Sequence, residues 1–523
     1  MTQVQIESYL SGRWQAGTGP GAVLVNPATE APVASASTVG LDFGNALAFA
    51  RTTGGAELRA LTFAQRGAVL ERMSGALHAA REGLIEAQLV NGGCTRGDAK
   101  FDVDGAIGVL YHYAELGKSL GDRRLLADGE GIQLGRSPRF WGQHVYVPRR
   151  GVAVLINAFN FPAWGFAEKA ACALLAGMPV ITKPATSTAL TAYLATKVLV
   201  DAGLPPGILS FVGGGSGDLL DHLQGQDILS FTGSANTGHK LRSHRRVVEA
   251  SVPVNVEADS LNAAVLGPDV ELGSDTMQLF LRDLSREITQ KTGQKCTAVR
   301  RIFVPAERVD DVVAELSARF SETVIGDPAL KEVRMGPLAS ADQLRDVRAG
   351  VERLQKDATV VYGDPQAKLA PLGVEPGRGY FFPVLLLKAK NSAHSPEVHS
   401  HEVFGPVATV LPYSGKAEEA AELVALGGGG LVASIFSDDR DFTETATLGI
   451  APFHGRVYLG SAKVLEHAMG PGLVLPQTIH GGPGRAGGGE ELGGLRGVEH
   501  FMQRTAIQGS RPIVEHLTGT KPT

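Results

Sequence analysis

The chain has 523 residues, a formal net charge of −5 and 43% hydrophobic residues, enough to bury large cores in roughly two to four domains. Its positive and negative residues are well mixed and form no basic block, which argues against binding to nucleic acid or to a membrane surface. The 3 cysteines form no Cys-x-x-Cys pair. This argues against a disulfide framework or a structural zinc site and favours a reducing compartment, the cytoplasm.

The first part of the chain predicts short strands followed by a helical layer. Residues 1–7 contain neither a basic nor an apolar leader segment, so we expect no export signal. Residues 8–38 are typical of short strands and turns. Apolar residues recur at helical spacing between about 43 and 118. Residues 130–150 mix apolar and polar residues in a way that favours an extended hairpin.

From residue 152 to 266, short apolar runs alternate with helical stretches. We expect strands at 152–156, 179–182, 208–212, 228–231 and 252–256, and helices at 162–175, 187–202, 215–223 and 235–248. This alternation predicts an α/β fold whose parallel sheet has helices on both faces and binds ligands at the carboxyl ends of its strands.

A second alternation runs from about 270 to 470. It predicts helices near 274–292 and 306–320 and strands near 298–304 and 383–389, and the tail at 500–516 is expected to be extended. The charge-free stretches 151–167 and 467–484 are interrupted by Gly, Pro or Asn and do not predict membrane spans.

Several polar residues fall at the predicted carboxyl ends of strands. Asn160 precedes a helix that begins with proline, where its amide either stabilises an oxyanion or caps the helix. Lys183 is either a ribose or phosphate ligand or an ordinary exposed lysine. Gly233 and Ser234 are expected to direct free backbone N–H groups toward a pyrophosphate. Glu257 lies among apolar residues, where a buried carboxylate is costly and its proton affinity is expected to rise.

The thiol of Cys296 differs from the other two thiols in its surroundings. Cys94 lies in a turn-like segment, and Cys172 lies in an apolar helical run, where a cysteine behaves as a small hydrophobic residue. Lys291 and Lys295 flank Cys296, and nearby positive charge favours the thiolate. Local sequence alone leaves both a nucleophile and a packed core residue open.

These residues belong to a set of motifs that resembles the aldehyde dehydrogenase superfamily in order and rough spacing. The resemblance extends over nearly the whole chain, including Leu10–Trp14 and Asn26–Thr29. The motifs are Asn160-Phe161-Pro162, Lys183-Pro184, Phe231-Thr232-Gly233-Ser234, Glu257, Gly293-Gln294-Lys295-Cys296 and Glu402-Val403-Phe404-Gly405-Pro406.

The resemblance implies three structural parts. A Rossmann-like cofactor domain would comprise 1–129 and 151–267, and a catalytic domain would comprise 268–480. A small β oligomerisation segment would comprise 130–150 and 497–523, with a homodimer as the expected assembly.

The resemblance also implies a catalytic mechanism. Cys296 would attack an aldehyde, and the resulting oxyanion would be held by the Asn160 amide and the Cys296 backbone N–H. After hydride transfer, Glu257 would activate the water that releases the acid. Lys169 and Glu491 match polar positions that are linked to proton relay in the family.

The expected cofactor is NADP, with NAD as a weaker alternative. In the family pattern, Lys183 and Glu402 would hold the cofactor riboses, and Phe404 would border the nicotinamide. Many NAD-preferring members have a glutamate where this chain has Thr186. Without that negative charge, Lys183 is free to pair with a 2′-phosphate.

A further departure from the usual pattern concerns the substrate. The segment Glu257-Ala258-Asp259-Ser260 resembles the aldehyde dehydrogenases that act on coenzyme A thioesters in aromatic-acid catabolism, of the phenylacetate and benzoate types. Phenylacetate-type proteins usually carry an additional hydratase domain, so we expect the benzoate type. The expected substrate is 3,4-dehydroadipyl-CoA semialdehyde or a close analogue. The glycine-rich segment 481–494, with Arg485 and Arg496, is a candidate entrance for coenzyme A.

Four alternative interpretations stay open. A general NAD(P)-dependent enzyme would act on free aldehydes, and a coenzyme A-acylating enzyme would commonly lack Glu257. A non-enzymatic binding protein of this fold would be expected to lose Cys296 or Glu257. A metal enzyme is disfavoured because the dehydrogenase motif already accounts for Glu402, and we expect no metal. Its candidate ligands would be His394, His399, His401 and Glu402.

Overall fold

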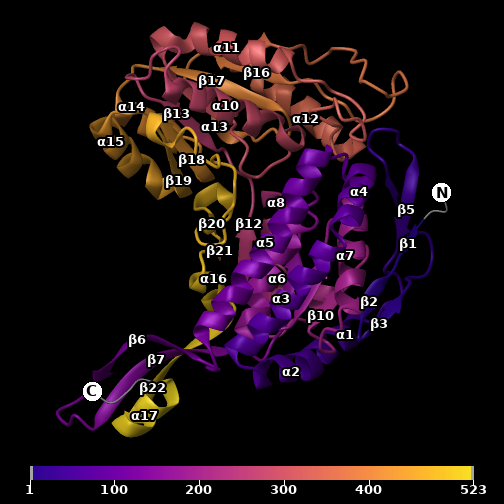
Figure 1. The fold of residues 1–523 in the computed structure, drawn as a ribbon, viewed down its shortest axis with the longest axis vertical. Coiled ribbons are helices and arrows are strands. Elements are labelled where there is room, and N and C mark those ends of the chain that lie inside the picture. Colours follow the sequence, from indigo (N-terminus) through magenta and orange to yellow (C-terminus); the bar gives the residue numbers. More distant parts are fainter. Residues whose placement is uncertain (1–3, 520–523) are drawn as a thin grey trace.

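Two seven-stranded sheets and a projecting three-stranded sheet organise the chain (Figure 1). The computed structural model describes residues 4–519. Residues 1–3 and 520–523, which the expected domain ranges include, lie outside the described residues. No helix between residues 4 and 519 is both long and apolar enough to cross a membrane. The predicted α/β fold class is confirmed, whereas the three domain ranges stay a prediction.

The first sheet combines five parallel strands with an antiparallel pair from the N-terminal part of the chain. Its order is β12-β11-β8-β9-β10-β2-β3. The strands are β2 (Ser8–Leu10), β3 (Arg13–Gln15), β8 (Ala153–Ile156), β9 (Val180–Lys183), β10 (Leu209–Phe211), β11 (Ile228–Thr232) and β12 (Val254–Glu257).

Helices cover both faces of this sheet, as the alternating sequence pattern predicted. Successive residues of a strand face opposite sides. Ala153 and Leu155 of β8 therefore pack in one apolar cluster with α3–α7, whereas Val154 packs in a second cluster with α1, α8 and α9. These helices are α1 (Phe43–Phe49), α3 (Phe63–Ala79), α4 (Arg81–Gly92), α5 (Arg96–Leu120), α6 (Trp164–Ala176), α7 (Ala189–Asp201), α8 (Ala235–Arg242) and α9 (Arg245–Glu249).

The second sheet is parallel except for one edge strand, in the order β15-β16-β17-β14-β13-β18-β19. Ala263 and Val265 face one apolar cluster, and Ala264 and Leu266 face the other. The strands are β13 (Ala263–Leu266), β14 (Arg301–Pro305), β15 (Ala358–Tyr362), β16 (Leu385–Ala389), β17 (Val407–Tyr413), β18 (Gly430–Phe436) and β19 (His454–Gly460). The helices are α10 (Asp275–Thr289), α11 (Val309–Ser321), α12 (Ala341–Leu354), α13 (Pro396–Ser400), α14 (Ala417–Ala425) and α15 (Arg440–Ile450).

A few short elements complete the two lobes. One strand pair lies next to the site described below, and it consists of β20 (Ile479–Gly481) and β21 (Glu490–Leu492). The remaining elements are β1 (Val4–Ile6), β4 (Ala22–Val25), β5 (Pro32–Ala36), α2 (Gly55–Ala60) and α16 (Leu495–His500).

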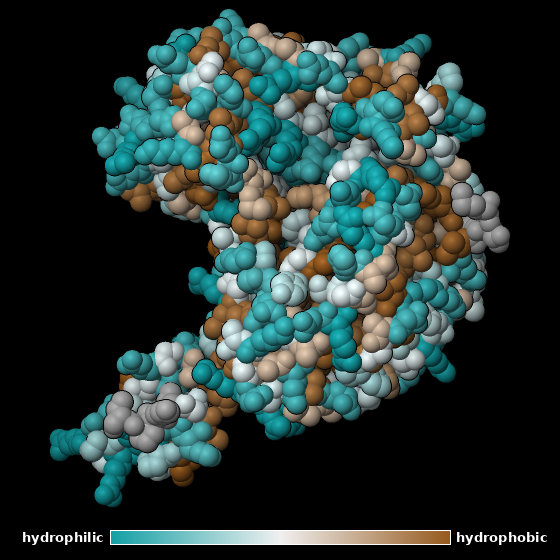
Figure 2. Space-filling view, viewed as in Figure 1, coloured by the Kyte–Doolittle hydropathy of each residue, from teal (hydrophilic) through white to brown (hydrophobic). Residues whose placement is uncertain are grey.

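The arm projects from the body and consists of β6 (Leu126–Gln133), β7 (Phe140–Pro148), β22 (Met502–Ser510) and α17 (Arg511–Thr518) (Figure 1). The hairpin predicted within 130–150 is confirmed. The expectation of an extended tail to 516 is wrong after Ser510, where α17 begins with a proline in its first turn. The space-filling view shows apolar residues on this arm (Figure 2).

Two other predicted elements differ from the structure. Instead of a helix at 215–223, only the short 3-10 turn Leu219–His222 forms, in a segment where glycine lowers the helical propensity. The helix predicted to start at Pro162 starts at Trp164. Asp102 of α5 accepts hydrogen bonds from the backbone N–H groups of Ala163 (3.2 Å) and Trp164 (2.8 Å), which fixes this start.

Candidate active site

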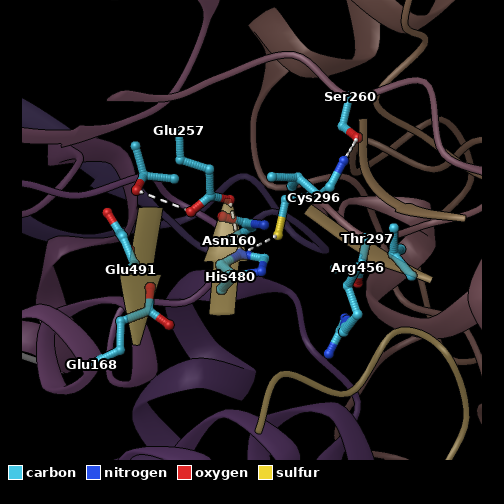
Figure 3. A network of polar contacts seen from close by, with 12 residues as sticks. Asn160, Glu168, Glu257, Ser260, Cys296, Thr297, Arg456, His480 and Glu491 are labelled. Carbon is cyan, nitrogen blue, oxygen red and sulfur yellow. Dashed lines mark hydrogen bonds and ion pairs between the residues drawn. The ribbon is translucent and has the colours of Figure 1, made fainter. Parts of the chain in front are cut away.

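The carboxyl ends of strands of the first sheet converge on a cavity that is lined by the predicted catalytic residues. The segment after β8 contributes Asn160, the end of β12 contributes Glu257, and the loop before β14 contributes Cys296. Side chains predicted from separate motifs thus meet in one place (Figure 3). One wall is apolar and contains edge-to-face aromatic contacts. Its residues are Phe101, Phe161, Trp164 and Val474.

The loop that carries Cys296 has an uncommon backbone. Lys291, Thr292 and Gly293 have φ values of 52°, 56° and 68°, in the left-handed region that costs energy for residues other than glycine. A side chain at position 293 would lie 2.2 Å from the Gly405 carbonyl oxygen. The Arg300 guanidinium donates to the carbonyls of Gly293 (2.9 Å) and Gly405 (2.8 Å). These contacts hold the loop, and so the thiol, in place.

The two flanking lysines do not lower the net pKa of the thiol. Lys295 Nζ lies 2.8 Å from a Glu287 carboxylate oxygen, and Lys291 Nζ contacts Cys94 Sγ at 3.5 Å. Burial raises the pKa of the Cys296 thiol well above its ordinary value, and the carboxylates near it raise the pKa further against a lowering by Lys295. Lys295 thus favours the thiolate as expected, but burial and the carboxylates outweigh it, and the net pKa of the thiol is raised.

His480 of β20 is a site residue that the sequence analysis missed. Its Nε2 lies 3.2 Å from Glu257 Oε1 and 3.8 Å from Cys296 Sγ. The side chains of His480 and Glu257 are 3% and 2% exposed, and with Cys296 they point toward one another (Figure 3). The sequence signal was weak, since His480 is one of two histidines, with His467, in the stretch 467–484, which has no Asp, Glu, Lys or Arg.

The predicted rise in the proton affinity of Glu257 is also wrong. Burial by itself raises the pKa of this carboxyl, but His480, Lys169 and a hydrogen bond from Cys296 together outweigh it. The net pKa of Glu257 lies below its ordinary value, so the carboxyl is ionised at neutral pH. The charged partner responsible is His480, which is distant in the sequence.

Asn160 lies beside the thiol, and one hydrogen of its side-chain amide is already hydrogen-bonded. The side chain is buried and lines the same cavity as Cys296. Its Nδ2 donates one hydrogen bond to the Gln294 carbonyl at 3.0 Å. An amide nitrogen carries two hydrogens, so one donor is left for an oxygen in the cavity.

Lys169 and Glu491 form a buried ion pair, with Nζ 3.0 Å from the carboxylate. Glu168, another residue missed from the sequence, lies 3.2 Å from the same Nζ. Glu491 also accepts from Asn255 at 3.0 Å. Carboxylate oxygens of Glu168, Glu257 and Glu491 lie within 4.8 Å of one another. Two adjacent charges within the apolar helix α6 were the signal for Glu168.

The residues predicted to hold a cofactor lie around the ends of β9 and β11. Lys183 Nζ donates to the Pro184 carbonyl at 3.0 Å, and burial lowers its pKa. No carboxylate among residues 4–519 lies within ion-pair distance of it. Thr186 begins a 3-10 turn three residues later. An ammonium group with unused donors beside a threonine fits a ribose or a phosphate.

Glu402 and Phe404 are the other two residues predicted to hold the cofactor. Glu402 Oε2 accepts from the Ser260 backbone N–H at 3.1 Å, whereas Oε1 has no hydrogen-bond partner and lies 3.6 Å from Arg300 Nε. Burial raises the pKa of Glu402 to about 7. Phe404 packs edge-to-face on Phe159 at 5.8 Å between centroids. The unpartnered oxygen fits a ribose hydroxyl, so these residues suit a nicotinamide dinucleotide.

The prediction for Gly233 is wrong in one respect. Its backbone N–H is not free, because it donates to the Glu257 carbonyl at 3.1 Å and so extends the pairing of β11 with β12. Ser234 caps α8 by accepting from the Thr237 backbone N–H. Asp259 accepts from the next backbone N–H, that of Ala235, at 3.1 Å.

The unusual residues after Glu257 brace the nucleophile loop. Asn262 Nδ2 donates to the Cys296 carbonyl at 2.7 Å, and Ser260 Oγ donates to Asn262 Oδ1 at 2.7 Å. Arg485 donates to the Ser400 carbonyl at 2.9 Å, and Arg496 pairs with a surface glutamate. Neither arginine lines the cavity at Cys296.

His399, one of the histidines considered as metal ligands, has other partners. His399 Nδ1 lies 3.0 Å from Arg301 Nη1, and its Nε2 lies 2.6 Å from the Ser392 carbonyl oxygen. Both ring nitrogens are therefore occupied, and Glu402 faces Ser260 and Arg300. The geometry gives no support to a metal site built on these residues.

Comparisons with known proteins agree with this geometry. The family model described as "Aldehyde dehydrogenase family" matches residues 14–507. The chain is 44% identical to 3,4-dehydroadipyl-CoA semialdehyde dehydrogenase of Aromatoleum evansii, over 92% of this chain and 93% of that protein. It is 30% identical to geranial dehydrogenase of Castellaniella defragrans, over 67% of this chain and 71% of that protein. The NAD+ complex of an aldehyde dehydrogenase from Bacillus cereus has the same fold, with a TM-score of 0.83, 23% identity and 97% of each chain covered.

Proposed function

The chain belongs to the aldehyde dehydrogenase family, and we propose that it oxidises a coenzyme A-linked semialdehyde to the acid with NADP+ during aromatic-compound catabolism. The substrate we propose is 3,4-dehydroadipyl-CoA semialdehyde or a close analogue. The supporting observation is 44% identity, over nearly the full length of both chains, to the Aromatoleum evansii protein named for this activity. The overall reaction consumes the aldehyde, NADP+ and water and yields the carboxylate, NADPH and two protons.

In the proposed acylation step, Cys296 attacks the aldehyde carbon and forms a thiohemiacetal. The free Asn160 amide hydrogen would hold its oxyanion, since preorganised donors stabilise charge that develops in the transition state. The thiol proton would pass to the Glu257 carboxylate, one oxygen of which lies within 4.8 Å of Cys296 Sγ. When bound, NADP+ supplies the hydride acceptor, so that a thioester remains on Cys296.

In the proposed deacylation step, Glu257 takes a proton from the water that attacks the thioester. It must first lose the proton gained during acylation. Glu168 and Glu491 lie within 4.8 Å of Glu257, and Lys169 bridges these two carboxylates. Because these side chains lie so close to one another, we propose that they relay the proton away from Glu257.

Lys183, Thr186, Glu402 and Phe404 would hold the dinucleotide, with Ser234 at the N-terminus of α8. We favour NADP+ because Lys183 has no ion-pair partner among the described residues and Thr186 adds no negative charge near it. A 2′-phosphate would be attracted there, whereas a glutamate at 186 would repel it.

The proposal includes a cytoplasmic homodimer. The three free thiols agree with a reducing compartment. The arm exposes apolar side chains that a second copy of the chain would cover. They include Ile132 (58% exposed), Phe140 (47%) and Ile513 (62%).

The substrate proposal is tested by steady-state kinetics with matched aldehydes. We expect kcat/KM for the coenzyme A-linked semialdehyde to exceed that for the free semialdehyde by about 100-fold or more, because remote binding energy helps position the reacting carbon. Comparable values would refute a coenzyme A-specific function and identify a general aldehyde dehydrogenase. Measuring each aldehyde with NADP+ and with NAD+ tests the cofactor at the same time.

A further inference from the structure

We propose that His480 is a positioning residue whose imidazolium is shared by Cys296 and Glu257, two groups that are anionic at different steps. This inference rests on the proposed thiol chemistry but not on the identity of the aldehyde or of the cofactor. It gives His480 the part that the sequence had suggested for Lys291 and Lys295.

The geometry supports one shared cation. A single atom, His480 Nε2, faces both Glu257 Oε1 at 3.2 Å and Cys296 Sγ at 3.8 Å. A buried carboxylate is costly unless it is paired, and Glu257 is nearly inaccessible to water.

Other cations nearby are bound elsewhere. Lys295 pairs with Glu287, and Lys169 pairs with Glu168 and Glu491. Arg456 donates to the backbone carbonyls of residues 471 and 473. Lys295 and Lys169 still act on Cys296 and Glu257 through space, but His480 contacts both of these groups directly.

The charged groups around His480 come from several elements. Burial lowers the pKa of the imidazole, but Glu257 of β12 and Glu168 of α6 raise it, with Arg456 of β19 acting against them, and its net pKa lies above the ordinary value. Lys169 pairs with Glu168 and Glu491 next to these groups.

The proton count explains how one cation serves two groups. In the proposed resting state, the thiol is protonated, the imidazole is protonated and Glu257 is ionised. During attack, the thiol proton moves to the carboxylate, so the negative charge passes from oxygen to sulfur while the imidazolium keeps its proton. In the thioester the sulfur is neutral, and once Glu257 has released its proton the imidazolium again faces a carboxylate. The proton transfer leaves the summed charge of the three groups unchanged, and the negative charge then passes from sulfur to the aldehyde oxygen as the C–S bond forms.

The experiment measures alkylation of Cys296 by iodoacetamide between pH 6 and 10, without aldehyde or cofactor, and identifies the labelled peptide by mass spectrometry. The variant His480→Gln keeps hydrogen-bonding capacity but loses the charge. We expect its alkylation midpoint to rise by about one pH unit and its rate at pH 8 to fall about tenfold. The variant His480→Lys, which restores a cation, should recover much of the wild-type rate.

The matched control is His454→Gln. His454 is a buried histidine whose pKa burial lowers to about 4, so it is neutral at the pH of the assay, and its Nδ1 lies 3.2 Å from a backbone carbonyl oxygen. This variant should keep the wild-type profile. If His480→Gln does not fold by circular dichroism, the comparison of His480→Asn with His480→Lys replaces it.

An unchanged alkylation midpoint in folded His480→Gln would overturn the inference, and so would failure of His480→Lys to exceed the neutral variant. These results are independent of the proposed function. A wild-type enzyme that shows the expected alkylation profile but does not oxidise the coenzyme A-linked aldehyde would refute the proposed substrate alone.

Discussion

Replacement of Lys169 by methionine gives a quantitative test of the buried network. The change keeps an unbranched side chain and removes the ammonium group, which lies 3.2 Å from Glu168 and 3.0 Å from Glu491 with its side chain only 1% exposed. At an effective dielectric constant of about 20, each contact is worth roughly 5 kcal/mol before desolvation is subtracted. Removing one partner of a buried pair generally costs about 3–5 kcal/mol, because an uncompensated charge stays behind.

A surface lysine provides the control for this variant. Lys118 also has two glutamates near its Nζ, Glu115 at 2.7 Å and Glu71 at 3.0 Å, but its side chain is 43% exposed. Ion pairs of this kind contribute little to stability. We therefore expect Lys118→Met to leave the free energy of unfolding nearly unchanged. Because both lysines contact two glutamates at similar distances, the difference between the two variants measures the effect of burial.

The loss in Lys169→Met should also depend on pH. Burial raises the pKa of Glu168 to about 7 even with Lys169 present. In the variant this pKa rises further, so the folded state binds more protons than the unfolded state between pH 4.5 and the folded pKa. Stability then falls as the pH rises through this window. The deficit should be smaller at pH 5.5 than at pH 8.

Pulse proteolysis in urea at pH 5.5 and pH 8 measures this stability for the wild type and both variants. A loss in Lys169→Met no larger than that in Lys118→Met would refute the reasoning. A loss that is the same at both pH values would show that Glu168 does not titrate as inferred.

The remaining predictions concern catalysis. Cys296→Ala should abolish aldehyde oxidation, measured as NADPH formation, while cofactor affinity and the activity of the control Cys172→Ala are retained. Glu257→Gln should form one equivalent of NADPH and then stall, with turnover about 10²- to 10⁴-fold slower; absence of an acyl adduct on Cys296 by mass spectrometry would require a different base. Asn160→Ala should lower kcat by about 10²- to 10³-fold with little change in cofactor affinity. Thr186→Glu should shift the ratio of kcat/KM values toward NAD+ by about tenfold or more, and a wild-type preference for NAD+ would contradict the premise.

Much of the fold follows from local periodicity. Most strands and helices between 152 and 266, though not the helix expected at 215–223, and the hairpin that forms the arm were predictable because each has a strong pattern of its own. The end of the tail was not, although Pro512 in the first turn of α17 was a usable signal. The start of α6 depends on Asp102, a capping residue about 60 positions earlier, and no local pattern reveals such a partner.

The candidate site was also predictable only in part. Motifs identified Cys296, Glu257 and Asn160, and the structure brings these three residues together around one cavity. Their electrostatics were not predictable, because the direction of a side chain decides where its charge acts. Lys295 is adjacent to the nucleophile in the sequence yet pairs with Glu287, whereas His480 is 184 residues away and faces the thiol.

This electrostatic arrangement constrains how the site works. Glu257 is stabilised as an anion, and its charge raises the pKa of Cys296. The thiolate and the carboxylate therefore disfavour each other. Because the two groups are close together in a buried cavity, both are rarely negatively charged at the same time. Acylation needs the sulfur anion and deacylation needs the carboxylate, so the chemistry separates in time the two states that the geometry makes incompatible. A cation placed between them at His480 would lower the energy of each state in turn without favouring both at once.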